Sequence, residues 1–446
     1  MRQQVRSRRS VLGAGVAVGA AAGAACVPGG AGGGGGQAPP AGVKSGVRVS
    51  FAYSAPPEVA GVMARAAQTL GEKVPGITAE YINTQGQNHN EKVTTAMAGG
   101  TPIDVFTLNP GDMVPFAHQG QVRAIDDLIR RDRYDATDFF EKCIGQYRWK
   151  GKGYALPRGF GNQDIYYNTA VWDGAGNKRP PYDWTSREWT TQEFLDAVLR
   201  VSRMSGSAGS SGAGVWGWNQ GTGLRQWAPW VWVFGGDILD QQGAKCILDQ
   251  GPAVEGLQFL QDLIHKHQVM PPPAARVNSM TAMGNGQLGM AMGIPSEVGR
   301  YRQIQGLAFD VAPMPKQATR LTSGGGIAWH MAAGTPHLNE AWELQKWVSS
   351  KDVQTWECEV GGTAPPRKSV IKSPCYNDRS GPPRGIDVFL QAPEFVHTDP
   401  QALGWAEAEE IVTAGLASLW DGSRTARQIT QDAVPQINRL LQERAG

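Results

Sequence analysis

The chain has 446 residues, which is enough for two or three domain cores. Lys and Arg total 42 against 40 Asp and Glu, so the net charge is +2 and the chain lacks the basic excess of a nucleic-acid-binding protein. Hydrophobic residues make up 41% and charged residues 18%, a balance typical of a globular protein and unlike that of a disordered or membrane-embedded one.

The first 25 residues have the pattern of a secretion signal. Arg8 and Arg9 precede an apolar stretch at 11–25 that is too short to span a bilayer comfortably. Residues 7–12 (SRRSVL) resemble a twin-arginine export signal, in which a receptor reads the two arginines. The alternative is the basic region of an ordinary secretory signal. Both interpretations predict that residues 1–25 are a signal peptide and that the protein is exported.

A cysteine and a glycine-rich run follow this stretch. Cys26 stands directly after small residues, which resembles the lipidation site of bacterial lipoproteins, although Gly23 occupies a position where Leu is usual. Gly at the density of residues 29–36 does not repay its ordering entropy, so a flexible tether is expected. Residues 26–46 are therefore predicted to be a lipidated cysteine followed by a tether. The protein is predicted to be either a cell-membrane lipoprotein or a periplasmic protein.

Strand-like and helix-like segments alternate from residue 47 onward. In chain order they are a strand at 47–53, a helix at 58–70, a strand at 77–82, a helix at 90–98 and a strand at 104–108. Such units predict an α/β fold with a mostly parallel sheet, which binds ligands at the carboxyl ends of its strands. The loops at 54–58 and 109–112 are then expected on one rim.

Five tryptophans gather in the middle of the chain, at Trp216, Trp218, Trp227, Trp230 and Trp232. Their spacing favours a helical core stripe, because Trp227 and Trp230 are three residues apart. An aromatic platform for a sugar ring is the alternative, since nearby amides and Arg225 could bond hydroxyl groups. We expect most of these side chains in the core and one or two at a ligand.

Four cysteines remain besides Cys26, and four allow three disulfide pairings. Cys358 and Cys375 are close in sequence and flank a turn rich in Gly and Pro, so this pair is favoured, with Cys143 and Cys246 as buried thiols. The sequence contains no metal-binding spacing of His and Cys and no dinucleotide fingerprint, so we expect neither a metal nor a cofactor.

A series of segments along the body carries a resemblance to a known family. They are KVTTAMAGGTPID (92–104), GQVRAIDDL (120–128), YALPRGFGNQDIYYN (154–168), PYDWTSREWTTQEF (181–194), NGQLGMAMG (285–293), FDVAPMP (309–315), EAWELQKWVS (340–349) and GGTAPPRKS (361–369). In this order they resemble the family 1 extracellular solute-binding proteins of ABC importers. Each segment is weak alone, and the shared order over nearly the whole body carries the resemblance.

The resemblance implies a two-lobed periplasmic-binding-protein fold with a hinge and a ligand cleft between the lobes. The chain would cross between lobes near 156–162, 310–314 and 363–366, where Gly or Pro adjoins a strand-like run. One lobe would comprise residues 47–158 with 311–360, and the other residues 159–310 with 361–446.

The resemblance also implies ligand-binding residues at matching positions. On the first lobe and its crossing these are Ser54, Glu58, Asn109, Asp112, Arg158 and Asn162; on the second lobe they are Arg225, Gln226, Trp227, Ser296, Glu297 and Trp405. Gly325, Gly326, Trp329 and Arg367 rank behind them. Ser296 and Glu297 stand where a maltose binder has a stacking Trp, which argues against a maltodextrin ligand. Trp405, ahead of a helix expected at 407–419, matches another stacking aromatic and is the favoured single contact.

The function implied is capture of a carbohydrate outside the cell by a monomeric binding protein that delivers it to an ABC permease. An exported carbohydrate-active enzyme or oxidoreductase is the rival class, although no nucleophile elbow or metal cluster appears in the sequence. A binder of peptides, polyamines or phosphate esters would keep the fold and change the pocket.

Overall fold

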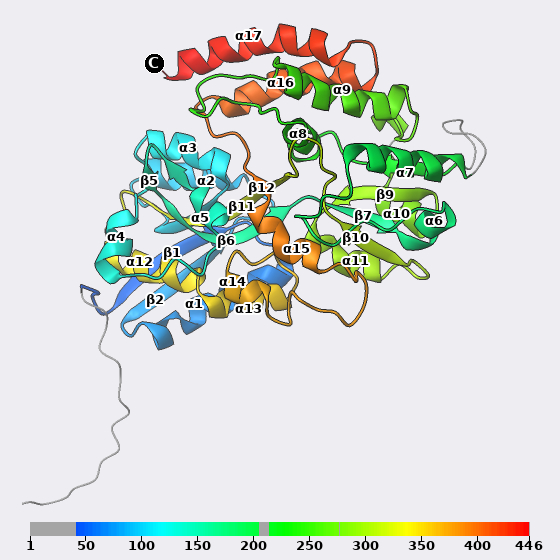
Figure 1. Ribbon diagram of the computed structural model, residues 1–446. Coiled ribbons are helices and arrows are strands. Elements are labelled where there is room, and N and C mark those ends of the chain that lie inside the picture. The colour runs from blue at the N-terminus through cyan, green and yellow to red at the C-terminus, as the bar shows by residue number, and fades with distance from the viewer. Residues whose placement is uncertain (1–41, 205–213, 276, 446) are drawn as a thin grey trace, which may run out of the picture. The chain divides into compact units, whose positions relative to one another are not determined.

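The computed structural model describes residues 42–204, 214–275 and 277–445 (Figure 1). The expected signal peptide, Cys26 and most of the expected tether lie outside the described residues. Strands and helices alternate along the chain as expected, so the protein has an α/β fold. In the described part of the chain, no helix is both long enough and apolar enough to cross a membrane.

The first sheet has six strands. They are β1 (Val47–Tyr53), β2 (Ile77–Asn83), β3 (Val105–Leu108), β6 (Ala155–Asn162), β11 (Thr322–Met331) and β12 (Val396–His397). Strand β1 lies between β2 and β3 and is parallel to both. Strand β11 is antiparallel to β3 and β6 and parallel to β12. The three strands predicted at 47–53, 77–82 and 104–108 are therefore confirmed, and they form the parallel part of this sheet.

The second sheet has four strands, in the spatial order β10-β7-β9-β8. Their bounds are β7 (Asp164–Asn168), β8 (Trp216–Asn219), β9 (Leu288–Gly293) and β10 (Phe309–Ala312). Strands β4 (Arg148–Trp149) and β5 (Lys152–Gly153) form a separate small hairpin. Strands β7 and β9 are buried along their whole lengths, because helices pack on this sheet.

The helices of the first half begin with α1 (Pro57–Lys73) and α2 (His89–Ala98), which confirm the predicted helices at 58–70 and 90–98. They continue with α3 (Pro110–His118), α4 (Asp126–Asp132), α5 (Glu141–Gly145), α6 (Thr169–Gly174), α7 (Thr191–Arg203) and α8 (Leu224–Val233). Helices α1 and α12 pack on the first sheet, whereas α6, α7 and α10 pack on the second (Figure 1).

The second half adds longer helices at the C-terminal end. Its helices are α9 (Gly251–His265), α10 (Ser279–Gly284), α11 (Val298–Arg302), α12 (Leu338–Val348), α13 (Lys351–Glu359), α14 (Lys368–Ile371), α15 (Asp387–Gln391), α16 (Trp405–Trp420) and α17 (Ala426–Ala445). Helix α16 contains the predicted helix at 407–419 and packs with α17 against α9. The two C-terminal helices therefore lie against α9.

Each sheet has its own hydrophobic core, which gives the fold two lobes. The core around the second sheet is built from residues between 165 and 314 together with residues between 386 and 441. The cores around the first sheet come from residues between 49 and 156 together with residues between 329 and 353. Because both cores draw on separate stretches of sequence, the chain has to pass between the lobes more than once.

The passages lie at slightly different places from those predicted. Residues 159–162, predicted in the second lobe, still pair with β11 of the first sheet, so the first passage falls at Gln163. Residues 311 and 312, predicted in the first lobe, pair with β7 of the second sheet, so the next passage lies at 313–321. Strand β12 also returns to the first sheet from within the span 361–446. The predictions placed the passages at nearby Gly and Pro residues, but β6 and β10 keep their backbone pairing with neighbouring strands beyond the predicted boundaries.

Strand β6, just before the first passage, is fastened to the end of α13 and the segment that follows it. The Phe160 amide donates to the Ala364 carbonyl over 2.9 Å, and Arg158 forms a buried ion pair with Glu357. Cys358 and Cys375 form a disulfide next to this pair, as favoured from the sequence, and Cys143 and Cys246 are buried free thiols. These contacts hold β6, the end of α13 and residues 360–366 together where the lobes meet.

Candidate functional site

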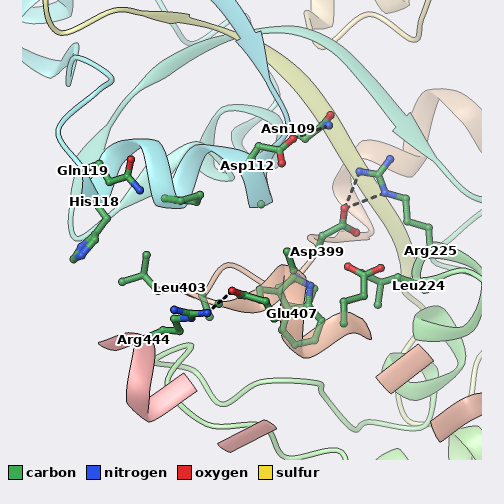
Figure 2. Close-up of a pocket in the computed structure, with 18 of the residues that line it drawn as sticks. Asn109, Asp112, His118, Gln119, Leu224, Arg225, Asp399, Leu403, Glu407 and Arg444 are labelled. Atoms are coloured by element: carbon green, nitrogen blue, oxygen red, sulfur yellow. Dashed lines mark hydrogen bonds and ion pairs between the residues drawn. The ribbon is translucent and has the colours of Figure 1, made fainter. Parts of the chain in front are cut away.

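A cavity of about 720 Å³ lies between elements of the two lobes (Figure 2). One wall is α3 with the preceding Asn109, and the other consists of residues 224–226 at the start of α8, residues 399–409 around the start of α16, and Arg444 of α17. Figure 2 shows Asn109, Asp112, Arg225 and Asp399 toward one end of this cavity and His118 and Gln119 toward the other. We call this space the main cleft.

Helix α3 begins at the main cleft because of its local sequence. Strand β3 ends at Leu108, Asn109 occupies the N-cap position, and Pro110 starts the helix with a backbone angle that suits the first turn. Asp112 then lies in the first turn, where the helix dipole favours a carboxylate, and it accepts a hydrogen bond from Asn109 Nδ2 over 3.2 Å. The predicted rim loop therefore carries a fixed amide and a fixed carboxylate.

Arg225 and Asp399 form an ion pair at one end of the main cleft. Arg225 Nε and Nη2 donate to Asp399 Oδ2 over 3.0 and 2.7 Å. Burial lowers the pKa of Arg225, but the charge and hydrogen bonds of Asp399 outweigh it and raise that pKa overall. The guanidinium lies so close to Gly325 of β11 that a Cβ there would overlap Arg225 Nη2, so a side chain at this position would displace the guanidinium. Arg225 therefore stays charged, and its charge is already balanced.

Trp405 begins α16 after Gly404, whose φ of 78° suits glycine. Its side chain is only 6% exposed and belongs to the core of the second lobe, yet the residue also lines the main cleft. Glu409 lies one turn further along α16. Burial, and then the charge of Asp399, raise its pKa, while the indole of Trp405 and the charge of Arg225 lower it. The start of α16 thus presents an indole and a carboxylate that forms no ion pair with any residue the structure describes.

Two smaller cavities adjoin the main cleft, and Asn109 lines all three. One, of about 320 Å³, is lined by Tyr53, Arg158, Ser296 and residues of β6 and β11. The other, of about 450 Å³, is lined by Ser54, residues 87–90 and residues 107–109. Arg158 lies with its guanidinium carbon 3.8 Å from the centre of the Tyr53 ring. Asn109 therefore stands at the junction of a larger binding space.

The structure brings most of the predicted residues to these cavities. The main cleft is lined by Asn109, Asp112, Arg225, Gln226 and Trp405; the 320 Å³ cavity by Arg158, Ser296, Gly325 and Gly326; and the 450 Å³ cavity by Ser54. Glu58, Asn162, Trp227, Glu297, Trp329 and Arg367 line none of the three. The expected site thus divides into a group at the cleft and a group outside it.

Two of the residues outside the cleft are tryptophans. Trp227 is 1% exposed and Trp329 is 0% exposed, so neither side chain presents a surface to a ligand in this structure. Helix α8 is buried from Trp227 to Val233, because its neighbours on all sides are apolar. Trp218, Trp230 and Trp232 are buried as well, which agrees with the expectation of a core role for most of this group.

The polar residues outside the cleft are occupied elsewhere or face solvent. Arg367 donates to the Ser349 carbonyl, the Asp138 carboxylate and the Tyr134 hydroxyl. Glu297 accepts from the Ile294 amide and pairs with Arg300, and buried Asn162 donates to Asp164. Glu58 is exposed in the first turn of α1. These side chains therefore contact other parts of the protein or solvent in this structure, and the Oδ1 atom of Asn162 is buried without a hydrogen-bond partner among the described residues.

Several cleft residues were not predicted. Asp399, Glu407, Glu409 and Arg444 line the main cleft, and the Arg444 and Glu407 side chains form an ion pair of 2.7 Å. The segment 399–409 contains the predicted Trp405, and this tryptophan was the one local signal that pointed to Asp399, Glu407 and Glu409. Arg444 lies 37 residues beyond Glu407 and meets it only because α17 folds back along α16.

In the described residues, no group of three or more His, Cys, Asp or Glu side chains is arranged to hold a metal ion. The polar groups of the cleft are suited to hydrogen bonding: amides, carboxylates, ion-paired guanidinium groups, one imidazole and one indole. Such a set suits reversible binding of a polar molecule.

The family model for the bacterial extracellular solute-binding proteins matches residues 55–355. The chain belongs to this family. A putative binding protein of Brucella abortus is 22% identical over 374 residues, which cover 83% of this chain and 87% of the relative.

Solved structures agree with this fold. The sugar-binding protein MalE of Xanthomonas citri is 18% identical, with a TM-score of 0.76 over 89% of this chain and 98% of the other. UgpB of Mycobacterium tuberculosis, solved with glycerophosphocholine, is 20% identical, with a TM-score of 0.71 over 92% of this chain and all of the other. The two-lobed fold of periplasmic solute-binding proteins is thus shared with a protein named as sugar-binding and with one solved with glycerophosphocholine.

Proposed function

We propose that this protein is the substrate-binding component of an ABC importer and that it captures a neutral carbohydrate outside the cell membrane. It would work as a monomer, deliver the sugar to a membrane permease, and carry out no chemical reaction on it. Membership of the solute-binding family supports the transport role, and the sugar-binding MalE shares the fold. The nature of the ligand is argued from the cleft itself.

The observation that carries the proposal is the pairing of cations in the cleft. Arg225 is paired with Asp399 and Arg444 with Glu407, and in the adjoining cavity Arg158 is paired with Glu357. No lysine is among the residues described as lining these cavities. A phosphate ester or a uronic acid would therefore find no free guanidinium or ammonium group to balance its charge.

Groups that bond neutral hydroxyls remain available. Within the described residues Asp112 and Glu409 carry no ion pair, and Asn109 and Gln226 contribute amides to the main cleft. A sugar hydroxyl can donate to a carboxylate and accept from an amide or guanidinium group at the same time. The indole of Trp405 adds apolar surface for the C–H face of a ring. A neutral polyhydroxyl ligand satisfies this set, whereas an anion does not.

Binding is proposed to act through closure of the lobes. The bending segments would be the passages at Gln163, 313–321 and 360–366, so that residues 47–162 with 322–360 move against most of the remaining chain. A ligand that touches both walls of the main cleft binds the closed state more tightly, and this difference in affinity shifts the population toward it. The permease would then recognise the closed form.

A ligand panel tests this function. Thermal unfolding is measured with neutral mono- and oligosaccharides, with oligogalacturonides, with glycerophosphocholine and with spermidine. We expect stabilisation that grows with concentration for a neutral saccharide only. X-ray scattering with that saccharide should show a smaller radius of gyration, and chromatography should show the saccharide unchanged. Stabilisation by an anion or by spermidine alone contradicts the proposal, and released products would identify an enzyme.

We further propose export through the twin-arginine signal and anchoring by a lipid on Cys26. A single acyl chain binds membranes only marginally, so several chains are needed for stable anchoring. Cys26→Ser is expected to release the protein from the membrane fraction of cells, measured by fractionation and immunoblotting. Wild-type protein serves as the bound control, and a variant that stays in the membrane fraction argues for another anchor.

A further inference from the structure

We propose that the main cleft is a groove that runs along the whole of α3, and that its outer end binds a further sugar unit. The ligand is then an oligosaccharide lying lengthwise, not a single ring at Trp405. This inference rests on the proposed carbohydrate function and adds to it a subsite formed by His118, Gln119, Glu407 and Arg444. These four residues define the outer subsite.

The groove follows one face of α3. Gly111, Asp112, Pro115, His118 and Gln119 line it, and this spacing places them on one side of the helix. Met113, Val114, Phe116 and Ala117 are buried in the first lobe. Eight residues separate Gly111 from Gln119, and at 1.5 Å per residue they extend for about 12 Å. The lining thus continues well beyond the Asn109 and Arg225 end.

The opposite wall also extends away from the Arg225 end. It comprises Arg225, Asp399, Leu403, Trp405, Glu407 and Arg444, and Leu403 lies toward the His118 side in Figure 2. Figure 2 shows Arg444 and Glu407 on the side of the cavity where His118 and Gln119 lie, away from Arg225. Both walls therefore contribute polar side chains at the outer end, and they come from α3, α16 and α17.

The outer subsite has hydrogen-bonding capacity to spare. The side chains of His118 and Gln119 are exposed and form no hydrogen bond within the described part of the chain. His118 packs edge-on against Trp149 of the β4–β5 hairpin, with 5.8 Å between ring centres, which limits its freedom. The Arg444–Glu407 pair supplies donors and acceptors with no net charge. These groups suit the hydroxyls of a neutral sugar.

Affinity as a function of chain length tests the proposal. Calorimetric titrations use glucose, galactose, mannose and xylose and their linear oligomers of two to five units. We expect the affinity to rise by tenfold or more from the monosaccharide to a longer member of the series that binds. In the double variant Gln119→Ala/Arg444→Ala, the longest oligomer should lose about tenfold in affinity, while the shortest ligand changes less than twofold.

Two comparisons separate contact from folding. Lys178→Ala removes one partner of an exposed ion pair with Glu188 that lines none of the cavities, and it should leave every affinity unchanged. Arg444→Lys retains the charge and should recover part of the loss seen with alanine. Both variants should keep the wild-type melting temperature, because each altered side chain is exposed.

The possible failures are distinct. Binding of a monosaccharide with no gain from longer chains overturns the outer subsite and leaves the carbohydrate function standing. An equal loss for short and long ligands in the double variant also overturns it, since the outer residues would then act on the whole site. A protein that binds none of these saccharides contradicts the proposed function, and the subsite falls with it.

Discussion

Replacement of Trp405 by alanine is expected to lower both ligand affinity and thermal stability. The side chain lines the main cleft, so its loss should weaken saccharide binding by about 2 to 4 kcal/mol, as at other aromatic hot spots. It is also only 6% exposed within the core of the second lobe. Truncation of such a Trp leaves a cavity and costs about 3 to 5 kcal/mol of unfolding free energy. Calorimetry and thermal unfolding on the same variant measure the two losses.

Two further variants separate these effects. Trp227 is 1% exposed in the same core and lines none of the three cavities, so Trp227→Ala should lower stability and leave affinity unchanged. Trp405→Phe keeps much of the core volume and should recover stability more than affinity. If Trp405→Ala retains wild-type affinity in the folded protein, Trp405 is a core residue that contributes nothing to binding.

Removal of Arg158 alone should destabilise the protein strongly. Arg158 and Glu357 are 2% and 1% exposed, and they join β6 to the end of α13 over 3.0 Å. Burial raises the pKa of Glu357 and the charge of Arg158 opposes that rise, so Arg158→Met leaves a buried carboxyl group without its counter-charge. Breaking a buried pair in this way costs about 3 to 5 kcal/mol. Denaturant unfolding at neutral pH measures the change.

The double variant Arg158→Met/Glu357→Met should be far more stable than Arg158→Met, because no charge remains buried. Lys178→Met breaks an exposed ion pair and provides the comparison, with an expected loss of less than about 1 kcal/mol. A loss this small for Arg158→Met would mean that water or another group compensates Glu357, and the pair would then not be needed to hold β6 against α13.

The elements predicted with most success are those with a strong periodic pattern. The strand at 47–53 and the helix at 58–70 correspond to β1 and α1, and the helix at 407–419 lies within α16. The rim loop at 109–112 also lies at the main cleft, because the end of a parallel strand fixes where such a loop falls. The disulfide between Cys358 and Cys375 followed from closeness in sequence. These features depend on short-range information.

The residues that complete the cleft depend on long-range packing. Arg225 meets Asp399, 174 residues further on, and Glu407 meets Arg444 because α17 folds back along α16. Nothing in the local sequence around either partner indicates the other. The same holds for Arg367, which lies in a motif of the family but is held by Ser349, Asp138 and Tyr134. A motif gives a position in the fold, and the neighbours decide what the side chain does there.

The sequence by itself determined the alternating strands and helices, the family and the general location of a cleft, because hydrophobic periodicity and ordered motifs are local properties of the chain. Only the tertiary structure decided which polar groups in that cleft remain free. Every arginine at the three cavities has a carboxylate partner, whereas Asp112 and Glu409 form no ion pair among the residues that the structure describes. This pairing arises from contacts between distant segments, and it is the basis for proposing a neutral ligand over an anionic one.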